Sequence, residues 1–192
     1  SAGAHIRAMK RSAAMLRAGQ EVREFHLDAE LLHEFRQHGS QYPAYGSIVA
    51  GGANACVLHY RADAGPILSG DLVLIDAGCE LDGYASDITR TFPANGKFSA
   101  AQRELYDLVL ASQDAAVAAT RAGARFVDPH EATVKVWLRA CLATGYWTAK
   151  KWRSRERARV LSIPTKPQSR SWLKACWTSA CWMPTKWGMR KT

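Results

Sequence analysis

Residues 70–98 read GDLVLIDAGCELDGYASDITRTFPANGKF, and this segment is the strongest indication of the fold. An apolar run over residues 72–75 ends at Asp76, and an Asp-Gly dipeptide then signals a turn before a mixed run that contains Asp87. We expect two antiparallel strands, with the two carboxylates within about two residues of facing each other. A charged acid at the end of a buried strand needs hydrogen-bond donors or a metal. Paired acids across one hairpin therefore indicate a divalent-cation site, and an Asp-rich turn with ordinary hydrogen bonds is the alternative.

The hairpin sequence DAGCELDGYASDITRTFPANGKF and the sequence IVAGGANACVLHY at residues 48–60 resemble motifs of the aminopeptidase P (Xaa-Pro aminopeptidase) family of metallopeptidases. The likeness covers roughly residues 5–136. It implies an α+β fold: the first half of a pita-bread catalytic domain, an antiparallel sheet covered by helices. It also implies that Asp76 and Asp87 are ligands of a centre of two divalent metal ions, most commonly manganese.

His59 closes the second of two short apolar runs, at residues 47–50 and 55–58. A single His at the end of a strand is usually an ordinary polar residue, so the residues by themselves leave its role open. The resemblance implies that His59 lies beside the metals, contacts the substrate and helps to stabilise the tetrahedral intermediate. Tyr45 matches a family aromatic near the pocket for the first residue of the substrate.

The implied reaction is metal-assisted hydrolysis that removes the first residue from peptides with proline in the second position. A prolidase-like dipeptidase is the alternative within the enzymes, and a non-catalytic half-domain that binds a partner is the alternative outside them. In the family, a His, two Glu and a further His come from later in the domain. Beyond His130 this chain has no His, and beyond Glu131 its only Glu is Glu156. We therefore expect weak metal binding and little hydrolysis.

Four segments have the pattern of helices. The first spans residues 5–18, and the second spans 24–38 with Leu27, Leu31 and Phe35 on one side. The others begin at Ser99 and at Asp128, where a proline occupies the first helical position. Helices combined with antiparallel hairpins predict the α+β class.

The composition bounds the remaining possibilities. A length of 192 residues predicts one domain, and the five scattered Cys residues suit reduced thiols. No run of about 18 apolar residues and no secretory signal is evident. We expect a cytoplasmic protein that does not bind membranes, with association into homo-oligomers left open.

The net charge of +9 describes neither half of the chain. Residues 1–136 hold 13 Lys and Arg against 16 Asp and Glu, whereas residues 137–192 hold 13 Lys and Arg against one acid. All seven Trp lie in the second part and all six His in the first. We therefore divide the chain into a partial pita-bread domain, residues 1–144, and a Trp-, Arg- and Lys-rich tail, residues 145–192. Binding of nucleic acid or an anionic membrane by the tail is the less favoured interpretation.

The abrupt change of composition predicts a shifted reading frame in the gene downstream of codon 136. Sequencing of the DNA checks this, and an intact frame through the tail would contradict it. Salt-dependent binding of single-stranded DNA that disappears when residues 145–192 are deleted would instead support the nucleic-acid interpretation.

Overall fold

The computed structural model describes residues 1–143, which fall into two compact units, Ser1–Ser99 and the residues from Ala100 onward. The predictions for the tail at residues 145–192, and for a domain boundary after residue 144, lie outside the described residues.

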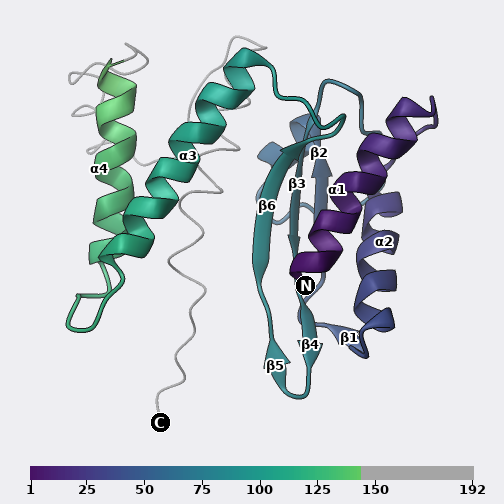
Figure 1. Cartoon of the computed structure of the whole chain (residues 1–192), viewed down its shortest axis with the longest axis horizontal. Coiled ribbons are helices and arrows are strands. Elements are labelled where there is room, and N and C mark those ends of the chain that lie inside the picture. The colour runs from purple at the N-terminus through teal and green to yellow at the C-terminus, as the bar shows by residue number, and fades with distance from the viewer. Residues whose placement is uncertain (144–192) are drawn as a thin grey trace. The chain divides into compact units, whose positions relative to one another are not determined.

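The first unit combines two helices with two small antiparallel sheets (Figure 1). The strands β2, β3 and β6 form one sheet with β3 in the middle, and β1, β4 and β5 form the other with β4 in the middle. This mixture of helices and antiparallel strands confirms the predicted α+β class. The elements in chain order are α1 (Ala2–Arg17), α2 (Glu24–Gln37), β1 (Tyr42–Pro43), β2 (Ile48–Gly51), a 3-10 helix η1 (Gly52–Cys56), β3 (Leu72–Ala77), β4 (Cys79–Leu81), β5 (Tyr84–Ala85) and β6 (Ile88–Pro93).

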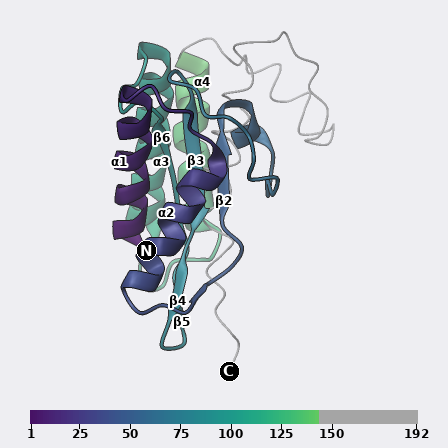
Figure 2. The ribbon, with the colours of Figure 1, turned by 90° about the vertical axis from the view of Figure 1, so that its right-hand side faces the viewer.

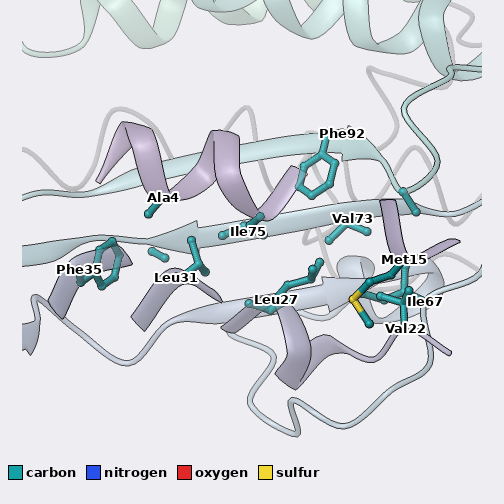
Figure 3. Packing of buried hydrophobic residues seen from close by; sticks show 14 residues of the cluster. Ala4, Met15, Val22, Leu27, Leu31, Phe35, Ile67, Val73, Ile75 and Phe92 are labelled. Atoms are coloured by element: carbon teal, nitrogen blue, oxygen red, sulfur yellow. The ribbon is translucent and has the colours of Figure 1, made fainter. Parts of the chain in front are cut away.

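The core of this unit lies between the two helices and one face of the β2-β3-β6 sheet (Figures 1 and 2). Val73, Ile75 and Ala77 occupy every second position of β3, so their side chains lie on one face and pack into this core. Figure 3 shows Val73 and Ile75 in this packing. Leu74 has the opposite parity and packs with a second cluster that contains Ile48 and Ala50. Asp76 shares the parity of Leu74, so the strand directs its carboxylate away from the helix-covered face.

The second helix shows how the apolar spacing fixes the packing. Leu27, Leu31 and Phe35 are all buried, as their spacing predicts, and they form one stripe against the sheet. Glu24 lies at the start of the same stripe and is fully buried as well. A charged residue in this position requires polar partners, which the sequence by itself does not identify.

The hairpin turn falls where the sequence predicts it. Asp82 and Gly83 are the two central residues between β4 and β5, with φ of 52° and 82°. Positive φ at both positions is the geometry of a type I′ turn, for which Asp-Gly is a preferred dipeptide. Nearer the sheet, a Cβ on Gly78 would lie 1.8 Å from the carbonyl oxygen of Ser86. Only glycine therefore permits the close approach of the two chain segments beside Asp76 and Asp87.

The structure differs from the prediction after β2. The apolar run at residues 55–58 is not a strand: η1 covers Gly52–Cys56, and Val57 and Leu58 are exposed. His59 consequently lies in a turn, with a left-handed φ of 53°, and not at the end of a strand. A four-residue apolar run is too short to separate a strand from a buried turn of helix by periodicity alone.

The described part of the second unit is a pair of helices, α3 (Ala100–Ala119) and α4 (Asp128–Ala143). They pack on each other, and the hydroxyl of Thr133 lies 3.4 Å from the carbonyl oxygen of Ser112 on α3. Its single proton is shared with the carbonyl oxygen of Pro129 in the same helix, at 3.1 Å. The start of α4 at Asp128-Pro129 is as predicted. Within residues 1–143, none of the helices is long and apolar enough to cross a membrane.

The stripe on α2 gives a matched test of the core. Leu31→Ala removes a side chain with 0% exposure and is expected to lower the free energy of unfolding by about 2–5 kcal/mol. Leu32→Ala alters a neighbour that is 37% exposed, and should lower the free energy of unfolding by about 1 kcal/mol or less. Urea denaturation of both variants measures the difference, and equal costs would contradict the described packing.

Candidate functional site

The pairing of β3 with β6 positions the two candidate metal ligands. Asp76 on β3 lies opposite Thr89, and Asp87 precedes the first residue of β6, Ile88, which pairs with Ala77. The two acids are thus within two positions of facing each other, as the hairpin interpretation requires. Their proximity follows from the strand register and needs no contact from the rest of the chain.

Tyr45, on the segment between β1 and β2, joins the two carboxylates. Its hydroxyl lies 2.6 Å from Oδ1 of Asp76 and 2.8 Å from Oδ1 of Asp87. A phenol has one proton, so it donates fully to only one of these oxygens at a time. The three side chains therefore converge on one point, with two carboxylate oxygens held around a single hydroxyl.

The surroundings keep this hydroxyl protonated. Burial of Tyr45 raises its pKa above the ordinary value of 10.0, and the hydrogen bonds and negative charges of Asp76 and Asp87 raise the pKa further. A phenolate here would stand against two carboxylates, which is unfavourable in a poorly solvated position.

The two acids differ in exposure, which shapes what the site can do. Asp76 is 4% exposed, whereas Asp87 lies at the surface. One carboxylate is therefore enclosed by the fold while the other is open to solvent. Carboxylate oxygens are hard donors that suit hard divalent cations such as manganese or magnesium.

The two carboxylates supply only part of a metal site. Among the residues that the structure describes, no group of three or more His, Cys, Asp and Glu side chains is placed to hold a metal ion. The oxygen donors present thus fit the chemistry of a divalent cation, but further ligands are needed to complete its coordination.

Three of the four predicted site residues are joined by hydrogen bonds, and the fourth, His59, lies on a separate turn. Tyr45, Asp76 and Asp87 are joined by hydrogen bonds, and their roles as substrate-binding residue and metal ligands stay predictions. His59, the predicted catalytic residue, belongs to the same compact unit and lies on the exposed turn after η1. The sequence analysis missed Glu24, whose signal was an acid at a buried position of the α2 stripe.

Known proteins resemble this chain in sequence and in structure. The model of metallopeptidase family M24 matches residues 1–158. The Xaa-Pro aminopeptidase of Escherichia coli (strain K12) is 45% identical over 140 residues, which are 73% of this chain and 32% of that protein. The structure of the Pseudomonas aeruginosa aminopeptidase PepP has a TM-score of 0.74 and 49% identity, over 81% of this chain and 34% of that one. Zinc-substituted E. coli aminopeptidase P in complex with product has a TM-score of 0.72 and 40% identity, over the same shares of the two chains.

The chain belongs to metallopeptidase family M24, a family of metal-dependent peptidases. It is similar to proteins named Xaa-Pro aminopeptidase, and its structure matches the pita-bread domain of aminopeptidase P over about four fifths of its length, which confirms the predicted family and fold. The chain spans about a third of the length of these relatives.

The hydrogen bonds of Tyr45 predict a measurable effect on stability. Tyr45→Phe should lower the free energy of unfolding at neutral pH by about 1–3 kcal/mol, because hydrogen bonds to charged groups contribute this much. Tyr84→Phe is the matched control: Tyr84 is 84% exposed, and its variant should change stability by less than about 0.5 kcal/mol.

The pH dependence provides a second measurement on the same pair of variants. Because the folded state raises the pKa of Tyr45, its contribution is fully present below pH 10.0, the ordinary value, and is lost as the pH rises above it. Urea denaturation at increasing pH should show a steeper alkaline loss in the wild type than in Tyr45→Phe. Parallel curves for the two proteins would contradict the description of the site.

Proposed function

We propose that this chain forms part of the catalytic domain of an Xaa-Pro aminopeptidase, with Asp76 and Asp87 as ligands of two divalent metal ions, manganese in the first instance. The observation that carries the proposal is the convergence of both carboxylates on the hydroxyl of Tyr45. Two acids brought to one point by adjacent strands form a suitable start for a cation site.

We assign each of these side chains a role in the proposed reaction. When bound, the metal ions supply Lewis-acid polarisation and an activated water for peptide hydrolysis. The buried Asp76 holds the metal ions on the side of the fold, and the exposed Asp87 holds them on the side of solvent. Tyr45 orients both carboxylates and lines the pocket for the first residue of the substrate. His59 donates a hydrogen bond to the carbonyl oxygen of the substrate, where negative charge develops during the reaction.

We propose peptides with proline in the second position as substrates. The names of the relatives support removal of one residue from such peptides over the prolidase-like alternative. The cytoplasmic location, the association into homo-oligomers and the binding properties of the tail stay predictions.

We further propose that this 192-residue chain, by itself, binds the metal weakly and hydrolyses such peptides little. The described residues offer two carboxylates at the site, and the sequence after Glu131 contains only Glu156 as a further Glu and no His. Divalent ions of this kind require several more donors for tight binding.

Titration calorimetry with manganese tests the ligand assignment. We expect the wild-type chain to bind with a dissociation constant of about 10⁻⁴ M or weaker, the range of sites with few charged ligands. Asp76→Asn and Asp87→Asn should each weaken binding by about tenfold or more, because each removes a negative charge from the site. Asp82→Asn removes the same charge at the turn of the hairpin and should leave binding unchanged.

Hydrolysis is measured in parallel, as manganese-dependent release of the first residue from an Xaa-Pro peptide. Rapid release by the purified chain would contradict the proposed impairment while supporting the assigned reaction. Equal manganese binding by the wild type and both site variants would contradict the ligand assignment itself.

A further inference from the structure

The segment that carries His59 is closed at its base by one buried side chain. Residues 51–65 leave the sheet at the end of β2 and return beside the start of α2, where the backbone N–H of Glu24 donates to the carbonyl oxygen of Gly65 at 3.0 Å. The Glu24 carboxylate accepts hydrogen bonds from the backbone N–H groups of Gly51, at 2.9 Å, and Gly65, at 2.7 Å. These two donors are the two ends of the segment, which makes it a closed loop of the omega type.

The same carboxylate also holds the interior of the segment. The side-chain amide of Asn54 donates to Oε1 of Glu24 at 2.9 Å, and the hydroxyl of Tyr60 donates to Oε2 at 2.8 Å. Asn54 further donates to the hydroxyl of Tyr60 at 3.0 Å, which links the two inner contacts. Each carboxylate oxygen thus accepts one backbone and one side-chain hydrogen bond, and Glu24 is 0% exposed.

We infer that Glu24 is a positioning residue for His59: its carboxylate fixes the conformation of residues 51–65 and thereby the place of the imidazole. The inference rests on the proposed function for the role of His59 at the substrate. His59 follows the exposed pair Val57 and Leu58 and directly precedes Tyr60, the residue that Glu24 holds inward.

The charge state of Glu24 supports this role. Burial raises the pKa of the carboxyl group, but the hydrogen bonds from Gly51, Asn54, Gly65 and Tyr60 outweigh that effect and leave the pKa below its ordinary value. Glu24 is therefore ionised at neutral pH. Hydrogen bonds to an ionised acceptor are about twice as strong as those between neutral groups, so four of them hold the segment firmly.

The direction of these contacts separates positioning from general support of the fold. All four donors to Glu24 come from residues 51–65, whereas the apolar stripe of α2 packs against the sheet independently of them. Loss of the carboxylate should therefore loosen this segment and leave β3 and β6 in place.

The segment packs closely around the carboxylate, which offers a second way to disturb it. A Cβ on Gly65 would lie 2.5 Å from Nδ2 of Asn54 and 3.0 Å from Oε1 of Glu24. Gly65→Ala consequently displaces the donors while Glu24 itself is retained. Glu24→Gln keeps the shape of the side chain but turns one acceptor oxygen into a donor that faces other donors.

Two measurements on the full chain test the inference. In Glu24→Gln and in Gly65→Ala, amide hydrogen exchange over residues 51–65 should become about tenfold to a hundredfold faster, while exchange in β3 and β6 stays as in the wild type. The NMR signals of the His59 imidazole, assigned with His59→Gln, should shift in both variants. The signals of His5, a buried residue of α1 whose Nε2 lies 3.1 Å from the carbonyl oxygen of Ile88, should not.

Ser12→Ala is the matched control for loss of a buried polar contact. Ser12 is 0% exposed, and its hydroxyl donates to the carbonyl oxygen of Ala94 at 2.9 Å, away from residues 51–65. This variant should lower the overall stability without a selective change in the His59 signals or in exchange over residues 51–65. Wild-type His59 signals in Glu24→Gln, or equal shifts of all six His, would overturn the inference. If Glu24→Gln does not fold, Gly65→Ala decides by the same criteria.

Titration of the wild-type chain with an Xaa-Pro peptide and diamagnetic Zn²⁺ separates this inference from the proposed function. A shift of the His59 signals on addition of both supports a substrate contact. His59 signals that do not respond would contradict its proposed role at the substrate, while the exchange and variant data would still decide whether Glu24 fixes the segment.

Discussion

The antiparallel register between β3 and β6 is the constraint on which the candidate site depends. Asp76 lies opposite Thr89, and Asp87, directly before β6 and two positions before Thr89, has the same parity as Thr89. Both carboxylates therefore reach the hydroxyl of Tyr45. A slip of one residue would send one carboxylate to the other face of the sheet. The apolar side chains of β3 oppose such a slip, because Val73 and Ile75 would lose their buried positions under the helices.

The β2-β3-β6 sheet therefore has the main hydrophobic core on one face and the candidate site on the other. One face is covered by α1 and α2 and contains the main core, while Asp76 lies on the other with Leu74 and Ile48. The Tyr45 hydroxyl, 2.6 Å from Oδ1 of Asp76, offsets part of the free-energy cost of burying this acid. The stability of the helix-covered face allows the opposite face to hold two negative charges close together, a configuration that by itself disfavours folding.

The second helix extends this division to the segment that carries His59. Leu27 and Leu31 pack the core, and Glu24, on the same stripe, gathers the donors of residues 51–65. The helix α2 thus contacts both the sheet and residues 51–65. The segment that carries His59 is therefore anchored to the same helix that packs against the strand of Asp76. The chain belongs to a family of metal-dependent peptidases, and this arrangement of helix, sheet and loop is interpreted in that context.

Sequence patterns were sufficient to predict the family, the hairpin with its Asp-Gly turn, the paired acids and the apolar stripe of α2, because each is a local pattern with a period or a motif. It also predicted Tyr45 and His59 through resemblance, without their contacts. Three features are known from the folded structure alone: Tyr45 is hydrogen-bonded to both acids, residues 55–58 form no strand, and Glu24 closes the loop of residues 51–65. The hydrogen bonds of Tyr45 and Glu24 join residues about 30 to 40 positions apart, and no local periodicity encodes which donor meets which acceptor across such separations.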